Sequence, residues 1–186
     1  GDEAGTAITT GDYNVAVGFD AGSELTTGSE NILIGGKAGD ALTTASGNLA
    51  IGRASLTSDT LGSASTAIGF QTLQNQNFTS ATSTYNVAVG YQAGTAVTTG
   101  VQNTLIGSEA GDALTVGVRN VAVGYDSLSS DTKGSKSIAI GRSALATQNF
   151  TSATDAYNVA VGDYAGALIT TGTHNTLIGG LAGDAI

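Results

Sequence analysis

The sequence contains no cysteine, proline, methionine or tryptophan, and its only histidine is His174. Without cysteine, a disulfide framework and thiolate metal sites are excluded. With a single histidine, neither a histidine-based hydrolase dyad nor a zinc site can be assembled within one chain. Carboxylates alone could form a glycosidase pair, but nothing distinguishes two of the 15 Asp and Glu residues. We therefore expect no cofactor, no metal and no enzymatic activity.

Charge is also scarce, and it is mostly of one sign. Only 11% of the residues are charged and the net charge is −9, whereas a typical globular domain has roughly 25% charged residues. Six Lys and Arg residues cannot supply the basic face that a nucleic-acid backbone requires. An acidic surface disfavours anionic membranes, and the chain has neither a signal peptide nor a run of 18 apolar residues. We expect no nucleic-acid partner and no membrane insertion of this segment.

What the chain has in abundance is glycine and small aliphatic residues, arranged in a repeat. Hydrophobic residues make up 40% of the chain and there are 28 glycines, which predicts a thin, regular core. A five-residue unit, Asn-x-x-(Val/Ile)-Gly with Ser in place of Asn twice, occurs ten times. It begins at Asn14, Asn31, Asn48, Ser65, Asn86, Asn103, Asn120, Ser137, Asn158 and Asn175.

The spacing of this unit defines the organisation of the chain. Successive units start 17 residues apart, except for steps of 21 residues after Ser65 and after Ser137. We call residues 65–85 and 137–157 the long repeats. Four repeats make a super-repeat of 72 residues, which divides the chain into 14–85, 86–157 and a partial 158–186. We interpret residues 1–186 as one repetitive domain taken from a longer array.

Each 17-residue repeat is too short for a helix pair or a propeller blade and is rich in Gly and β-branched residues, which predicts two short strands joined by tight turns. We number each repeat from its Asn or Ser. Positions 2 and 4 then face one way and position 3 the other, and all three are largely apolar. One face should form the core of a parallel β-solenoid, and the other should meet a partner.

The second predicted strand shows a compensation between two positions. Where position 9 is Gly, position 12 is Leu, Val or Ile, as in Gly22 with Leu25 and Gly183 with Ile186; where position 9 is Leu, position 12 is polar, as in Leu56 with Asp59. Such a trade indicates that the two side chains share one packing space. Position 5 is Gly in all ten repeats, which marks a turn that needs positive φ or close backbone approach. These turn glycines are Gly18, Gly35, Gly52, Gly69, Gly90, Gly107, Gly124, Gly141, Gly162 and Gly179.

The combination of Asn-x-x-Ile-Gly, a following Ala and then Thr-Thr-Gly resembles the head repeats of trimeric autotransporter adhesins. It is more similar still to the 17-residue repeats of bacteriophage tail fibres, because adhesin heads typically use shorter repeats. The match covers all 186 residues. The resemblance implies a left-handed β-roll wound as a homotrimer, with an adhesive or host-recognition role. It also implies an extracellular location, on a virion tail fibre or a bacterial surface.

The polar residues of the repeat are interpreted as structural. The Asn ladder, formed by Asn14, Asn31, Asn48, Asn86, Asn103, Asn120, Asn158 and Asn175, should bond turn to turn at the corners of the roll. Asp40, Asp112 and Asp184, together with Asp59 and Asp131, are expected to be solvated turn carboxylates. The calcium-binding nonapeptide of β-rolls is absent.

Two rows of side chains are candidate surface contacts. The threonines Thr26, Thr43, Thr98 and Thr170 form a row that we expect to break in the third and fourth repeat of each super-repeat. The aromatic residues Phe19, Tyr91 and Tyr125 follow turn glycines and could stack on sugars. Our prediction is a structural or adhesive fibre segment that associates with itself and contacts a host glycan or protein receptor. The alternative is a monomeric solenoid that binds ice or glycan through its threonine-rich face.

Overall fold

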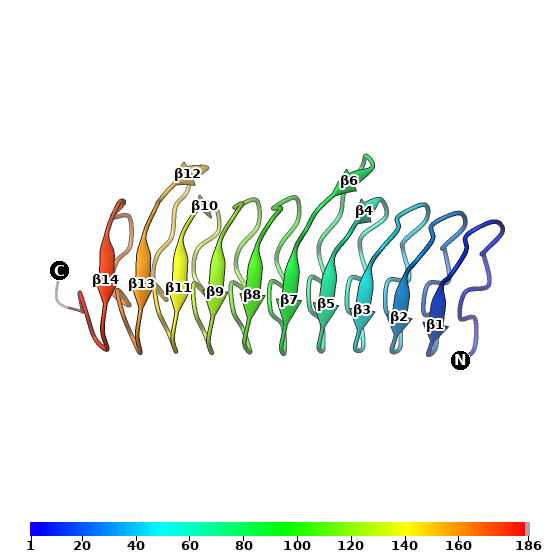
Figure 1. Ribbon diagram of the computed structural model, residues 1–186, viewed down its shortest axis with the longest axis horizontal. Helices are drawn as coiled ribbons and strands as arrows, with labels where there is room; N and C mark the ends of the chain where they lie inside the picture. Colours follow the sequence, from blue (N-terminus) through cyan, green and yellow to red (C-terminus); the bar gives the residue numbers. More distant parts are fainter. Residues whose placement is uncertain (185–186) are drawn as a thin grey trace.

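The apolar segment at positions 2 to 4 of every repeat is a β-strand, and these strands stack in parallel along one axis. In the computed structural model, which describes residues 1–184, they form a single ten-stranded sheet. The chain winds from one end of an elongated roll to the other, and each turn lies beside the next (Figure 1). The predicted all-β parallel β-solenoid is confirmed, and the described residues contain no helix. The ten strands are β1 Val15–Val17, β2 Ile32–Ile34, β3 Leu49–Ile51, β5 Thr66–Ile68, β7 Val87–Val89, β8 Thr104–Ile106, β9 Val121–Val123, β11 Ile138–Ile140, β13 Val159–Val161 and β14 Thr176–Ile178.

Each strand pairs with the equivalent residues of the next turn. Val15 of β1 lies opposite Ile32 of β2, and the long repeats keep this alignment, with Thr66 of β5 opposite Val87 of β7. Each long repeat contributes one short strand outside the main sheet, and the two resulting parallel pairings with the end of the preceding repeat project beyond the row of strands (Figure 1). These are β4 Gly62–Ser63 with β6 Thr82–Ser83, and β10 Gly134–Ser135 with β12 Thr154–Asp155.

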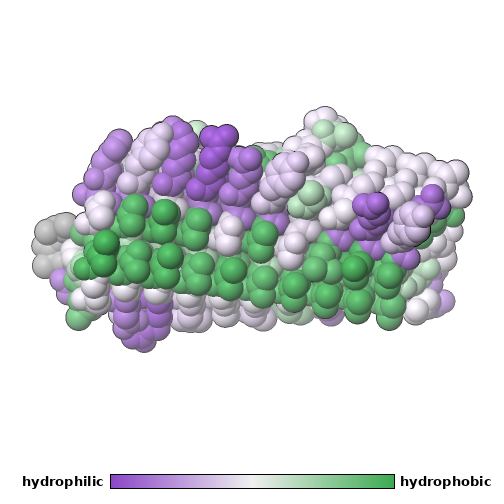
Figure 2. Space-filling view, in the orientation of Figure 1, coloured by the Kyte–Doolittle hydropathy of each residue, from purple (hydrophilic) through white to green (hydrophobic). Residues whose placement is uncertain are grey.

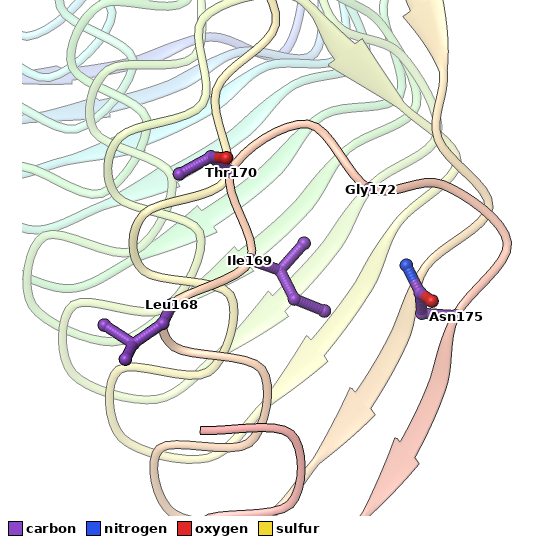
Figure 3. A pocket seen from close by; sticks show the side chains of 5 residues that line it. All are labelled: Leu168, Ile169, Thr170, Gly172 and Asn175. Atoms are coloured by element: carbon purple, nitrogen blue, oxygen red, sulfur yellow. The ribbon is translucent and has the colours of Figure 1, made fainter. Parts of the chain in front are cut away.

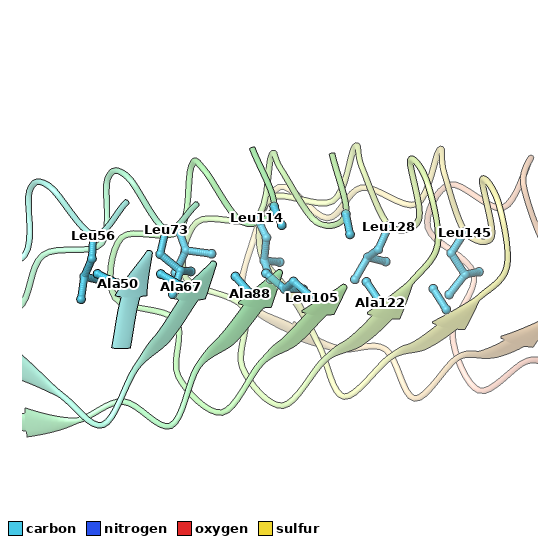
Figure 4. Packing of buried hydrophobic residues seen from close by; sticks show 14 of the residues in the cluster. Ala50, Leu56, Ala67, Leu73, Ala88, Leu105, Leu114, Ala122, Leu128 and Leu145 are labelled. Carbon is cyan, nitrogen blue, oxygen red and sulfur yellow. The ribbon is translucent and has the colours of Figure 1, made fainter. Parts of the chain in front are cut away.

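Position 3 of each repeat supplies the core side chain of its strand. Ala50, Ala67 and Leu105 are fully buried; Ala50 and Ala67 lie near Leu56 and Leu73, and Leu105 lies near Leu114 (Figure 4). Positions 2 and 4 point outward, so the outward face of the sheet is the one that lacks a partner within the chain. The alternation predicted from the sequence is therefore correct, and the structure decides which face is the core.

The compensation at positions 9 and 12 has a direct packing reason. A Cβ added to Gly22 would lie 2.6 Å from Cδ1 of Leu33. A Cβ added to Gly39 would lie 2.8 Å from both Leu33 and Leu42. Glycine at position 9 thus makes room for leucine at positions 3 and 12, since these side chains share a narrow interior. The pair Gly183 and Ile186 reaches beyond the described residues, because Ile186 lies outside them.

The second strand predicted for every repeat is wrong. Residues 19–24 and their equivalents form tight turns, and regular pairing outside the main sheet occurs only at the long repeats. The turns still bond to their neighbours, because the Gly22 amide donates to the Ala38 carbonyl at 3.0 Å and the Thr26 amide to the Thr43 carbonyl at 2.8 Å. Left-handed backbone at positions 7 and 9 interrupts the extended chain, even where position 9 is Leu, as at Leu56 with φ 54°.

The turn glycine at position 5 is required by close approach of the main chain. Gly107 has φ 139°, and a Cβ there would lie 2.3 Å from the carbonyl oxygen of Gly124 in the next turn. The main chains of successive turns are therefore in direct contact at this corner, and only glycine permits such an approach.

The Asn side chains at position 1 bond within and between turns. Asn103 Nδ2 donates to the Gly117 carbonyl at 2.9 Å, which closes its own turn. Asn103 Oδ1 accepts the backbone amide of Asn120 at 2.9 Å, which joins it to the next turn. Because these groups are buried, each bond also avoids an unsatisfied polar atom.

Candidate functional site: the apolar strip

The outward face of the main sheet is a continuous apolar surface. Val17 is 52% exposed, Ile32 40% and Ile178 72%, although all three are aliphatic. Figure 2 shows these side chains as a hydrophobic band that runs along the roll between more polar margins. A contiguous exposed apolar patch is a candidate interaction surface. We call it the apolar strip; it consists of Val15, Val17, Ile32, Ile34, Leu49, Ile51, Thr66, Ile68, Val87, Val89, Thr104, Ile106, Val121, Val123, Ile138, Ile140, Val159, Val161, Thr176 and Ile178.

Two rows of residues border the apolar strip, and both carry charge. The upstream edge is the residue just before position 1 of each repeat, and it contains Glu30 and Arg119. The downstream edge is positions 6 and 7, and it contains Lys37 and Asp126. Each of these four lies within three residues of a strand, two beside β2 and two beside β9.

Only two cations of residues 1–184 form an ion pair within the chain. Lys136 Nζ lies 2.6 Å from Asp155 Oδ2, and Arg142 Nε lies 2.9 Å from Asp163 Oδ1. Hydrogen bonding to Asp155 raises the pKa of Lys136, and hydrogen bonding to Arg142 lowers the pKa of the Asp163 carboxyl. Both pairs lie at the surface, so the charges compensate each other but contribute little to the stability of the fold.

The predicted aromatic contacts are exposed on the downstream edge. Phe19, Tyr91 and Tyr125 are 53%, 49% and 54% exposed. The Tyr91 ring stacks on Phe70 with 5.5 Å between centroids, and the Arg53 guanidinium lies 5.7 Å from the Phe70 ring on the neighbouring turn. Of the three predicted contacts, Tyr91 is thus partly covered by a neighbouring ring within the chain.

Sequence reasoning missed a second aromatic row, on the upstream edge. Tyr13, Tyr85 and Tyr157 precede position 1 and are 85%, 60% and 46% exposed. Their recurrence every 72 residues was the available signal. They lie beside the apolar strip, each immediately before the first residue of a super-repeat.

The threonine row is longer than the sequence suggested and is bonded within the chain. Thr60 continues the row after Thr43, so the expected break in the third repeat is wrong; Asn77 is where the row is interrupted. Thr26 Oγ1 donates to the Thr43 carbonyl at 3.1 Å, and Thr98 Oγ1 donates to the Thr115 carbonyl at 3.2 Å. Hydroxyls used in this way are less able to order water or bind a sugar.

A buried polar cluster lies under the first long repeat, contrary to expectation. Asp59 is fully buried, not solvated. Its Oδ1 accepts a hydrogen bond from the Gly62 amide at 2.9 Å, and its Oδ2 accepts one from Gln76 Nε2 at 2.5 Å. Gln76 Nε2 also donates to Ser65 Oγ at 2.9 Å, and Gln76 Oε1 accepts Nδ2 of Asn86 at 2.8 Å. Burial raises the pKa of Asp59, because no cation offsets the lost hydration.

The second long repeat carries the same cluster with one difference. Gln148 Nε2 donates to Asp131 Oδ2 at 2.6 Å and to Ser137 Oγ at 3.0 Å, and Asn158 donates to Gln148 Oε1 at 2.7 Å. Asp131 is thus also buried, and the expectation of a solvated carboxylate is wrong for it too. In the first long repeat Ser65 Oγ lies 2.6 Å from Thr84 Oγ1, whereas residue 156, which corresponds to Thr84, is Ala.

Asp112 differs from Asp40 at the equivalent place in the roll. Asp40 Oδ1 accepts a hydrogen bond from Thr57 on the next turn, whereas Asp112 Oδ1 is buried with no partner. Burial, and to a smaller extent the charge of Glu109, raises the pKa of Asp112. The described residues contain no group of three or more His, Cys, Asp or Glu that could hold a metal ion.

A cavity of about 310 Å³ opens at the C-terminal end of the roll, beside β14 (Figure 3). Its lining residues Thr170 and Asn175 occupy repeat positions that in earlier turns are bonded to the following turn, as Thr26 is to Thr43 and Asn158 to Asn175. It is lined by Leu168, Ile169, Thr170, Gly172 and Asn175. The cavity belongs to the stacking surface of the roll and has no convergent polar groups of its own.

No family model matches this chain, and comparisons with curated proteins and with solved structures likewise gave no match. Among residues 1–184 there is no helix of the length and hydrophobicity that a membrane crossing requires.

Proposed function

We propose that this chain is a segment of a rigid, non-enzymatic fibre that associates with copies of itself through the apolar strip. The observation that carries the proposal is the row of aliphatic side chains on the outward face of the sheet, which are exposed on β1, β2, β8, β11 and β14 and half-buried on the other five strands. A monomer would leave this surface in water, whereas association would bury it at a gain of about 25 cal/mol per Å². The resemblance to phage tail fibres and adhesin heads favours a left-handed homotrimer outside the cell, on a virion or a bacterial surface.

The mechanical role follows from how the turns are joined. Main-chain bonds, the Asn ladder and the glycine corners tie every turn to the next. Ten turns at ~4.8 Å each give a rod on the order of 50 Å long. We further propose that each long repeat is a single 21-residue turn, supported by the alignment of Thr66 with Val87. Such a rod would hold a receptor-binding region at a fixed distance from its anchor.

The test is the solution mass of the chain by light scattering after size exclusion. The monomer has a mass of 18.2 kDa, and the proposal expects a mass three times larger. Ile106→Asp on the apolar strip should shift the protein toward monomer, because a charge would be buried at each interface. Val116→Asp is the matched control, because Val116 is 37% exposed and Ile106 38% but Val116 lies off the strip. A stable monomer at high concentration would contradict the proposal.

A monomeric binding module is the second candidate, favoured by the exposed rings of Phe19, Tyr91 and Tyr125. Glycan-array binding by a monomer, lost on replacing Tyr91 and Tyr125 by Ala, would support it. Thermal hysteresis by a monomer would instead indicate ice binding by the flat β-branched face.

A further inference from the structure

The apolar strip alone does not determine how two copies align along their length. Position 4 is Val or Ile in all ten repeats, and position 2 is Val, Ile, Leu or Thr. One copy could slide past another by a whole turn and still place aliphatic side chains against aliphatic side chains. A flat and repetitive surface of this kind specifies register weakly. The alignment must therefore come from the residues that border the strip.

Four charged residues on the two edges form two sets of opposite charge, and the two members of each set lie in the same turn of the roll. Glu30 lies on the upstream edge of β2 and Lys37 on its downstream edge; Arg119 and Asp126 hold the same places beside β9, with the charges reversed. Glu30, Lys37 and Arg119 are exposed and Asp126 is half-buried. None of the four is in an ion pair within residues 1–184. Arg119 Nε donates to Oε1 of the neutral Gln102 at 2.9 Å, so the four charges themselves are not compensated within the chain.

We propose that these residues are register keys: in the assembled fibre, Glu30 of one copy pairs with Lys37 of the neighbouring copy, and Arg119 pairs with Asp126. The inference rests on the proposed self-association through the apolar strip. In copies related by rotation about an axis parallel to the roll, equivalent residues lie at the same level along that axis. Such a rotation brings the upstream edge of one copy against the downstream edge of the next. The two pairs then form at each interface, at turns five apart.

Sliding one copy removes this match. A shift of one turn in one direction puts Glu30 opposite Asp20 and keeps a single attraction, between Arg119 and Glu109. In the other direction it keeps Glu30 near Arg53 but leaves Arg119 facing Arg142, which is already paired with Asp163. A shift by one super-repeat of four turns is the most serious competitor, because the apolar pattern is similar there. It puts Glu30 opposite Glu109, or Arg119 opposite Arg53. Like charges in contact oppose such a slip.

The shape of the two edges also favours this arrangement. The short strands β6 and β12 precede β7 and β13, so both projections lie on the upstream side of the sheet (Figure 1). An antiparallel two-fold arrangement, face to face, would bring the projecting edge of one copy against the projecting edge of the other. Rotation about a parallel axis brings the projecting edge against the plain one, so the two different edges are complementary.

The first experiment is a charge-swap cycle, read by light scattering over a dilution series at low salt. Lys37→Glu and Glu30→Lys should each raise the concentration at which the assembly dissociates by roughly tenfold, because an attraction becomes a repulsion at every interface. The double variant Glu30→Lys with Lys37→Glu should restore the wild-type value. Lys133→Glu and Glu24→Lys change the net charge equally but lie off both edges, and they should have little effect. Loss of assembly in the double variant as well would overturn the pairing.

The second experiment locates the contact directly. Because the chain has no cysteine, Glu30→Cys and Lys37→Cys copies can be mixed, refolded and treated with a short bismaleimide. Cross-linking between the two variants, and none between Glu30→Cys and Glu109→Cys, is the expected result. Cross-linking of Glu30→Cys to Arg119→Cys would show an antiparallel pair and overturn the inference. A wild-type monomer would instead refute the proposed function, so the two failures are distinguishable.

Discussion

The ordinary repeats and the long repeats form different hydrogen bonds at the corner occupied by position 1. In an ordinary repeat, a buried Asn such as Asn103 closes its own turn and bonds the next one. In the first long repeat, the shorter Ser65 stands at that corner, and Gln76 reaches in to bridge Asp59, Ser65 and Asn86. The long repeat thus replaces a neutral, repeated bond by a local network around a buried carboxylate. Extra chain length is accommodated at the cost of desolvating a charge.

The largest expected effect comes from substituting the glycine at position 5, which the ordinary and the long repeats share. Gly107→Ala places a Cβ 2.3 Å from the Gly124 carbonyl oxygen, so the turns must separate. We expect a loss of at least about 3 kcal/mol in the free energy of unfolding, or no folding. Gly47→Ala is the control, because Gly47 also has positive φ but a Cβ there meets nothing within 4 Å; it should cost about 1 kcal/mol. Urea unfolding followed by circular dichroism measures both, and equal losses would refute the backbone-contact argument.

The next effect separates the long repeats from the ordinary ones. Gln76→Leu removes the donor to Asp59 Oδ2 and leaves a buried carboxylate oxygen without a partner. It should lower the free energy of unfolding by about 2–4 kcal/mol. Gln74→Leu, two residues away and half-buried, should change it by less than about 1 kcal/mol. If the two variants unfold at the same urea concentration, the network does not stabilise the long repeat.

A third effect concerns pH and the Asp59 carboxyl. Its pKa in the folded chain is raised above the value of 3.8 by burial. The folded state therefore holds this proton more tightly than the unfolded state does. The contribution of Asp59 to the free energy of unfolding falls as pH rises from about 3.8 through the raised pKa, and it is lowest at neutral pH. Asp59→Asn should flatten the pH dependence of urea unfolding between pH 4 and pH 7, whatever its effect on stability itself. Parallel curves for the two proteins would show that Asp59 titrates normally.

The smallest effect compares the two long repeats with each other. Thr84 Oγ1 contacts Ser65 Oγ at 2.6 Å and donates to the Ser63 carbonyl at 3.1 Å, whereas Ala156 stands in its place beside Ser137. Thr84→Ala should cost about 1 kcal/mol. Ala156→Thr should change stability by less than that, because the gained bond is offset by the tighter packing. Thermal unfolding of the two reciprocal variants measures this difference; an equal loss in both would mean that each site is adapted to its own residue.

The sequence was sufficient for the strands because their pattern is simple. Alternation at positions 2, 3 and 4 predicted the sheet and its two apolar faces, whereas the structure was needed to show that position 3 faces the core. The prediction of a second strand was wrong because left-handed backbone occurs at Lys37 and Leu56 as well as at glycines. The residue types Lys and Leu do not indicate a positive φ. Burial of Asp59 had a signal that was overlooked: Asp59, Ser65 and Gln76 recur together as Asp131, Ser137 and Gln148. Polar residues that change in concert, at a position otherwise aliphatic, indicate a shared buried network.

The ladder of turns has a consequence for how such a chain can change over time. Each turn bonds only to its two neighbours, through residues about one repeat apart in sequence, such as Thr26 with Thr43 and Ser63 with Thr84. Removing or duplicating a whole repeat therefore leaves all the remaining bonds intact, except at the new junction. The length of the rod is thus open to selection in whole-turn steps, independently of what stands at its ends.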